Sequence, residues 1–233
     1  MKRNFFMMVI VCLFTVVALS SCQKDDDDDG INTINVVVEN GNNYNALIDA
    51  VILNVWDYSM EQNQTLVETE YKDGGFTINL PESVSSRYLE PLDEDMPNGI
   101  TVSNKNVNGG WASFIAFQSD EAVGYFYCRS GDWIGELMYV DGNSFITGIV
   151  TDSELDNGVT YTATYNLNMN LKKGWNMVYE KYSLSSFSYT SEITTTTPAN
   201  AKWYFESYDY YYETVSGSRA RKSLLPGKQK IRF

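Results

Sequence analysis

The strongest constraint on the fold is a run of alternating side chains at residues 161–171, which read YTATYNLNMNL. Apolar or aromatic side chains stand at the odd positions, and Thr or Asn stands at every even position. Successive side chains of a β-strand point to opposite faces, so the pattern predicts a strand with one buried and one solvated face. Such strands are typical of antiparallel sheets. The run therefore indicates an antiparallel all-β fold.

Shorter runs of the same kind follow one another through most of residues 31–206, separated by Gly, Asn, Asp and Pro. We expect strands at residues 33–39, 47–58, 65–71, 76–80, 111–118, 122–129, 135–141, 144–151 and 201–206. The strands do not alternate with long helical segments, which argues against a parallel α/β sheet. About ten short strands predict a single antiparallel β-sandwich, or a barrel-like domain, over residues 31–206.

Two local patterns add detail to this domain. The Asp-Gly-Gly sequence at residues 73–75 predicts a tight turn that joins 66–71 and 76–80 into a β-hairpin. Residues 82–90 carry the one convincing helical pattern, and Pro91 ends it. We therefore expect one short helix in an otherwise all-β domain.

The N-terminal residues have the organisation of a bacterial lipoprotein leader. Two basic residues precede an apolar stretch at 5–19, which is shorter than the roughly 20 residues of a transmembrane helix. The sequence LSS at 19–21 followed by Cys22 resembles the lipobox, whose cysteine is acylated and becomes the mature N-terminus. We expect a signal peptide at 1–21 and stable anchoring through two or three acyl chains on Cys22. An ordinary signal peptide with a chance cysteine is the alternative.

An acidic run directly follows Cys22. Adjacent carboxylates repel one another, so residues 22–30 are predicted to form a solvated tether. The run also resembles the export signal of Bacteroidota surface lipoproteins, which implies an outer-membrane protein facing the cell exterior. The residues assigned to this signal are Gln23, Lys24, Asp25, Asp26, Asp27, Asp28 and Asp29.

The folded part also resembles a recurring group of Bacteroidota lipoproteins. The similar segments are, in order, GGFTINLP, RYLEPL, GITVSNKN, VGYFYC, LMYVD, LKKGWNMVYE and KWYF. The resemblance spans roughly residues 34–206, as expected for one domain. The resemblance implies a surface lipoprotein with an all-β domain, and it transfers no catalytic or binding residue.

Composition excludes several kinds of chemistry. The net charge of −13 disfavours a nucleic-acid partner, whose phosphates need a basic surface. The chain has no histidine, the commonest general base and zinc ligand, and the mature domain keeps one cysteine, Cys128, which we expect to be a buried thiol. Residues 152–158, DSELDNG, resemble the start of a calcium loop but lack its later Gly and Glu, and they fit a hairpin turn better. We expect no catalytic residue, metal or cofactor.

Tryptophan is the residue type that points to a ligand. Aromatic rings stack on sugar faces, but they also dominate β-sheet cores. We expect Trp175 and Trp203 to lie in the core. Trp133, in a sequence that suggests a turn, is the first candidate for a ligand contact, and Trp111, after two glycines, is the second.

Residues 207–233 depart from the pattern of the domain, since they become basic and contain no acid after Glu213. We expect a disordered tail; a basic arm that touches anionic lipopolysaccharide or its own acidic domain is the alternative. The chain as a whole is predicted to be a surface-anchored, non-catalytic binding module for an extracellular glycan or protein. The alternatives are a structural or adhesive, fimbria-like component of a surface assembly and a glycoside hydrolase that works with carboxylates alone.

Overall fold

The computed structural model describes residues 31–57, 62–94, 96–156 and 159–208. The predicted signal peptide, Cys22, the predicted acidic tether and residues 209–233 of the predicted tail lie outside the described residues. The strands are β1 Thr33–Val37, β2 Ala50–Asp57, β3 Gln62–Glu70, β4 Gly75–Asn79, β5 Glu90–Pro91, β6 Ile100–Val102, β7 Asn108–Gln118, β8 Glu121–Ser130, β9 Trp133–Val140, β10 Ser144–Asp156, β11 Val159–Leu171, β12 Gly174–Leu184, β13 Ser188–Thr194 and β14 Lys202–Ser207. Two 3₁₀ helices complete the fold, η1 Gly41–Tyr44 and η2 Ser86–Tyr88.

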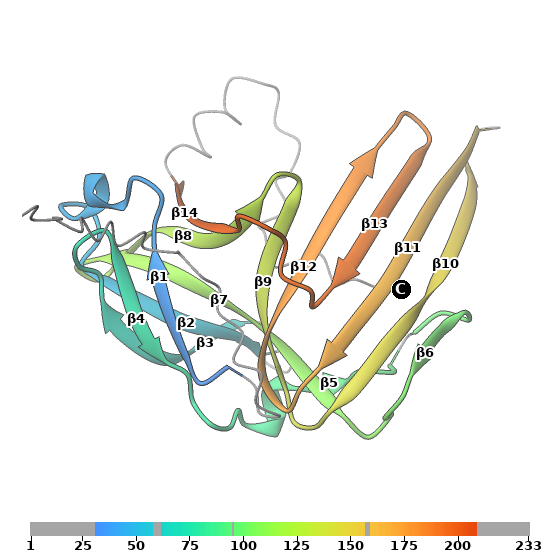
Figure 1. The fold of residues 1–233 in the computed structure, drawn as a ribbon, viewed down its shortest axis with the longest axis horizontal. Coiled ribbons are helices and arrows are strands. Elements are labelled where there is room, and N and C mark those ends of the chain that lie inside the picture. The colour runs from blue at the N-terminus through green and yellow to red at the C-terminus, as the bar shows by residue number, and fades with distance from the viewer. Residues whose placement is uncertain (1–30, 58–61, 95, 157–158, 209–233) are drawn as a thin grey trace, which may run out of the picture.

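Two sheets form the domain, which confirms the all-β prediction (Figure 1). β1 and β4 make a two-stranded sheet. The other strands form one large sheet in the order β3-β2-β7-β8-β9-β12-β13-β11-β10-β6, with β14 beside β8 and β5 beside β7. The sheets do not close into a barrel, and the arrangement is sandwich-like. Among the described residues, no helix is long and apolar enough to cross a membrane.

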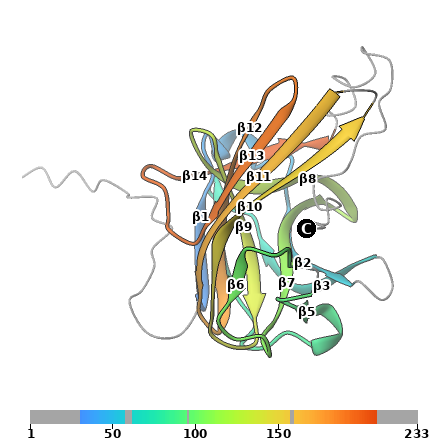
Figure 2. The ribbon, with the colours of Figure 1, turned by 90° about the vertical axis from the view of Figure 1, so that its right-hand side faces the viewer.

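The large sheet branches at β7. This strand pairs with β8 over residues 114–118 and with β9 over residues 109–112. β9 also pairs with β12, so the sheet extends from β9 through β12, β13, β11 and β10, which stand beside the β7–β8 part (Figures 1 and 2). The sheet bends where it branches at β7, and its two faces bury two different sets of side chains.

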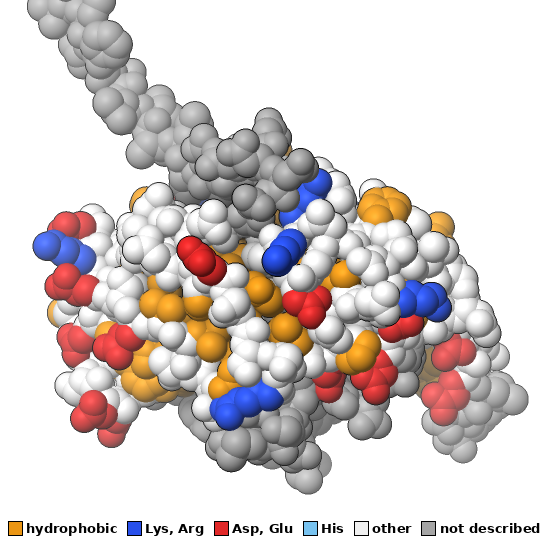
Figure 3. All heavy atoms as spheres, turned by 90° about the horizontal axis from the view of Figure 1, so that it is seen from below, with side chains coloured by type: hydrophobic (Ala, Val, Ile, Leu, Met, Phe, Trp, Pro, Cys, Tyr) orange, Lys and Arg blue, Asp and Glu red, His pale blue; other side chains and the backbone are white. Residues whose placement is uncertain are grey.

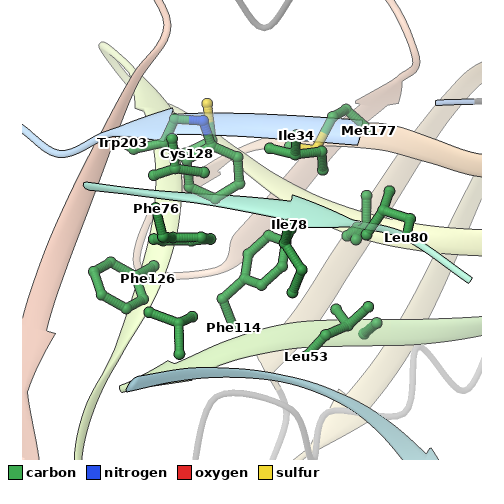
Figure 4. Packing of buried hydrophobic residues seen from close by; sticks show 14 of the residues in the cluster. Ile34, Leu53, Phe76, Ile78, Leu80, Phe114, Phe126, Cys128, Met177 and Trp203 are labelled. Atoms are coloured by element: carbon green, nitrogen blue, oxygen red, sulfur yellow. The ribbon is translucent and has the colours of Figure 1, made fainter. Parts of the chain in front are cut away.

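The first core lies between the two-stranded sheet and the β2–β7–β8 part of the large sheet. Phe76 and Ile78 of β4 are buried against Phe114 and Phe126 of the large sheet, and Trp203 of β14 joins them (Figure 4). The ring centroids of Phe76 and Phe114 are 5.2 Å apart, a distance typical of favourable edge-to-face pairs. Trp175 and Trp203 are both buried here, as predicted.

A second core lies on the opposite face of the large sheet. Its members come from β6, β9, β10, β11, β12 and β13, together with two loop residues. The buried residues are Leu92, Val102, Val107, Met138, Val140, Ile146, Leu167, Met169, Leu171, Val178 and Ile193. The alternation predicted for 161–171 is therefore confirmed in β11, where Leu167 is buried and Asn166 and Asn168 are exposed.

The predicted hairpin of 66–71 and 76–80 is wrong. The turn itself exists, with Lys72 bridged to Gly75, but β3 pairs with β2 and β4 pairs with β1. The chain passes from one sheet to the other at this point because Phe76 and Ile78 face the large sheet across the core. Gly75 permits the crossing, since a Cβ there would lie 2.0 Å from the carbonyl oxygen of Val36.

Two further features differ from a simple antiparallel sandwich. The helix expected over 82–90 is reduced to the three residues of η2, consistent with the cost of nucleating a helix in so short a segment. β13 lies between β11 and β12 in the sheet. It pairs with β12 antiparallel and with β11 in parallel, since β12 lies between these two strands in the sequence and runs in the opposite direction to both. The remaining strand pairings are antiparallel.

Candidate ligand-binding site

Trp133 begins β9 and is half-buried, with part of its side chain packed against the first core. It stands opposite Ser130 of β8 and Lys181 of β12. This position leaves part of the indole ring accessible beside the outer face of β12, β13 and β11. Trp133 is therefore partly accessible to a ligand, whereas Trp175 and Trp203 are buried in the core.

A hollow of about 220 Å³ lies next to the ring. Its other lining residues come from β11 and β13, whose parallel register places Asn166 beside Glu192 and Asn168 beside Thr194. These four side chains share the solvated face of the sheet, because each is two residues from the next along its strand. Ile193 completes the lining.

The charges around the hollow are balanced. The Lys181 ammonium lies 3.9 Å from the Glu192 carboxylate and 5.8 Å from the centroid of the Trp133 ring. An exposed ion pair of this kind adds little to stability, but it places one positive and one negative charge at the same edge of the hollow. The Lys181–Glu192 pair therefore gives the hollow no net charge that would attract an anionic or a cationic ligand.

The lining groups suit a ligand that carries many hydroxyl groups. The Asn166 and Asn168 amides both donate and accept hydrogen bonds, Thr194 can do either, and Glu192 accepts them. An aromatic wall beside a few convergent polar groups is the usual composition of a small-molecule site. Among the described lining residues, Glu192 is the one carboxylate, whereas glycoside hydrolysis commonly uses two.

Trp111, the second predicted ligand residue, does not join this site. It pairs with Met138 across β7 and β9 and packs against the second core, on the opposite face of the large sheet from Trp133. Trp111 is therefore less exposed than the sequence predicts, because it packs against the second core. The sequence did not reveal that core. Cys128 is fully buried in the first core, as expected.

The polar residues of the hollow were missed from the sequence, although a signal for two of them was present. The even positions of 161–171 predict that Asn166 and Asn168 share the wet face of a strand. Nothing in the sequence joins that face to Trp133, since the contact depends on β12 and β13 lying between β9 and β11.

A larger hollow of about 290 Å³ lies at the opposite end of the domain, between η1 and the turn before β4. Asn40, Asn42, Asn43 and Asp73 contribute its polar groups, and its described lining contains no aromatic ring. Among the described residues, no three acidic, Cys or His side chains come together as a metal site would require. Residues 157 and 158 of the DSELDNG segment lie outside the described residues.

Comparison of the chain with family models, with curated proteins and with solved structures gives no match. Its function must therefore be argued from the Trp133 hollow and the rest of its surface.

Proposed function

We propose that this protein is a lipid-anchored module of the outer cell surface that binds an extracellular carbohydrate without turning it over. The binding site is the Trp133 hollow, and the anchor is the acylated Cys22. The observation that carries the proposal is one half-buried indole ring beside a hollow lined by two amides, a hydroxyl and a carboxylate.

The geometry supports a sugar over a peptide or an anion. A pyranose has an apolar C–H face that can lie on an indole ring and a rim of hydroxyl groups that can bond to Asn, Thr and Glu side chains. The Lys181–Glu192 pair leaves the hollow close to neutral, which favours an uncharged sugar over an acidic polysaccharide.

Binding without hydrolysis is proposed because of where the carboxylates lie. Glu136 and Glu180, on the adjacent strands β9 and β12, are on the opposite face of the sheet from the hollow. Glu192, in the hollow, already pairs with Lys181. Among the described residues, a sugar held against Trp133 would therefore meet one lining carboxylate, Glu192, rather than the pair that glycosidases use.

The test is a glycan array probed with the mature protein, followed by calorimetry on the best ligand. We expect Trp133→Ala to weaken binding about tenfold, as the loss of about 1–2 kcal/mol from a stacked ring would do. Phe187→Ala is the matched control, because Phe187 is an exposed aromatic ring at the β12–β13 turn and lies beside Tyr161 rather than the hollow. Its binding should equal that of the wild type.

Two results would overturn the proposal. One is release of reducing sugar from a bound polysaccharide by the purified protein. The other is wild-type affinity in both Trp133→Ala and Asn168→Ala, a variant whose exposed position leaves the core intact.

A further inference from the structure

The face of the large sheet that carries Glu136 combines acidic and tyrosine side chains. Strand pairing puts acidic and tyrosine side chains on one face of six strands, directly beyond the second core. We call it the Glu136 face and define it by Tyr125, Tyr127, Glu136, Tyr165, Glu180, Tyr182, Tyr189, Ser191 and Glu206. None of its tyrosines belongs to the buried core, and Tyr182 is 48% exposed.

The carboxylates on this face are held in place by hydroxyl groups. Tyr189 and Ser191 donate to Oε1 of Glu180 at 3.0 and 2.6 Å. Tyr125 donates to Oε2 of Glu206 at 2.8 Å. Glu136 stands opposite Val178, two residues from Glu180 on β12, so both carboxylates project from the same face.

The acidic side chains lack basic partners on this face. In the described part of the chain, neither Glu136 nor Glu180 forms an ion pair with a lysine or arginine. The two nearest basic residues on β8 and β14 are already engaged, since Arg129 donates to the Gly131 carbonyl and Lys202 pairs with Glu39. A cation placed between Glu136 and Glu180 would neutralise charge that no described lysine or arginine neutralises.

The described chain ends on this same face. β14 pairs with β8, and the Tyr208 ring lies 6.1 Å from the Tyr125 ring. The 25 residues that follow, 209–233, could span up to about 3.3 Å each. Glu180 is two strands away from β8, a separation of about 10 Å. The following segment is therefore long enough to reach every part of the Glu136 face.

The charges of the two parts are opposite. Residues 31–208 contain 23 acidic and eight basic residues, a net charge of −15. Figure 3 shows one face of the domain with most of its acidic side chains toward the margin and hydrophobic ones near the middle, where a few acidic side chains also lie. Residues 214–233 contain no acid, and their basic residues are Arg219, Arg221, Lys222, Lys228, Lys230 and Arg232. Attraction between such parts is strong when the connecting chain keeps them close.

We propose that the basic segment 214–233 binds the Glu136 face of its own domain. Its lysine and arginine side chains pair with Glu136 and Glu180, and the surrounding tyrosine rings add cation–π contacts. The segment is thus an internal ligand of the sheet, and its occupancy falls as salt screens the charges. This inference is independent of the carbohydrate proposal, since the Trp133 hollow lies on the opposite face.

The test is limited trypsin digestion of the mature lipoprotein in a neutral detergent, with cleavage after the six basic residues followed by mass spectrometry. We expect the double variant Glu136→Gln/Glu180→Gln to be cut about fivefold faster in this segment, the ratio that corresponds to about 1 kcal/mol. The control Glu68→Gln/Glu70→Gln removes the same charge from the exposed edge of β3 and should be cut at the wild-type rate. High salt should bring the wild type to the rate of the first variant.

Zero-length carbodiimide cross-linking gives a second readout that does not depend on cleavage. Cross-links from Lys222, Lys228 or Lys230 to Glu136 or Glu180 are expected within one molecule. Equal cleavage in all three proteins, or cross-links only to other acids, overturns the proposal. A third result would also overturn the proposal: segment 214–233 is protected from trypsin only when lipopolysaccharide is added, and equally so in Glu136→Gln/Glu180→Gln. The segment would then be an arm that binds an anionic surface.

Discussion

Leu167 and Asn168 are neighbours in β11 but lie in opposite environments. Leu167 is 1% exposed in the second core, whereas Asn168 lines the Trp133 hollow. A single peptide step thus separates a residue that holds the domain together from one that is available to a ligand. The division follows from the two-residue period of a strand that has apolar packing on one side only.

A carboxylate introduced at these two positions should have very different effects. Leu167→Asp would bury a charge without a partner, which costs several kcal/mol of the roughly 5–15 kcal/mol that stabilises a domain, so we expect the protein to be unfolded or to melt far below the wild type. Asn168→Asp keeps its side chain in solvent and should change the free energy of unfolding by no more than about 0.5 kcal/mol. Thermal denaturation followed by circular dichroism measures both, and equal melting temperatures would contradict the assignment of faces.

At the scale of strands, the sequence predicted where most elements lie but not which elements are neighbours. Alternation located β2, β7, β8, β9 and β11 well, since each strand carries its own two-residue period. Alternation says nothing about pairing, so the passage from β3 to β4 between sheets and the parallel pairing of β11 with β13 were not foreseen. The second core was missed for the same reason, and with it the burial of Trp111.

The β9–β12 pair also contains a carboxylate in an unfavourable position. Glu136 reaches solvent, but it stands beside the second core within the bend of the sheet. Loss of surrounding water raises the pKa of its carboxyl above the ordinary value, and the nearby Glu180 charge raises it further. The folded state therefore favours the protonated form of Glu136.

Glu136→Gln should for this reason stabilise the domain at neutral pH. A group whose pKa is raised by folding contributes its full stability below the pKa of the unfolded chain and loses it as the pH rises through the folded pKa. Urea unfolding at high salt, where the basic segment is not paired with Glu136, should show the variant above the wild type at pH 7, with the two curves converging below pH 4.5, the ordinary pKa of this carboxyl. Glu121→Gln, at the exposed β7–β8 turn, is the control. A variant that is equally or less stable at pH 7 would show that the charged form is well accommodated.

At the scale of the whole molecule, we propose that three functions follow one another along the chain. The leader and Cys22 are proposed to hold the protein on the membrane, residues 31–206 to bind a ligand, and the basic segment to bind the domain. The acidic tether would separate the domain from the membrane by electrostatic repulsion within residues 22–30. Each part carries its own charge pattern, which is why these boundaries could be predicted without a structure.

The anchor can be tested independently of any ligand. Cells that express the wild type and are fed labelled palmitate should yield a labelled protein, because acylation requires the Cys22 thiol. Cys22→Ala should be unlabelled and should leave the membrane fraction. Cys128→Ala is the control, because this buried thiol lies in the folded domain, and it should be labelled as the wild type is. Label in Cys22→Ala would contradict the assignment.

The contact between the first and last strands sets the order in which the domain can fold during synthesis. Val38, just after β1, bridges to Trp203 of β14, the Glu39 amide donates to the Trp203 carbonyl, and Lys202 pairs with Glu39. Trp203 also packs in the first core with side chains of β1. The first core therefore stays incomplete until residue 203 has left the ribosome, since contacts so distant in sequence form late. A nascent chain therefore cannot complete its first core for most of its translation, and a chain without that core would suit the export proposed for this protein.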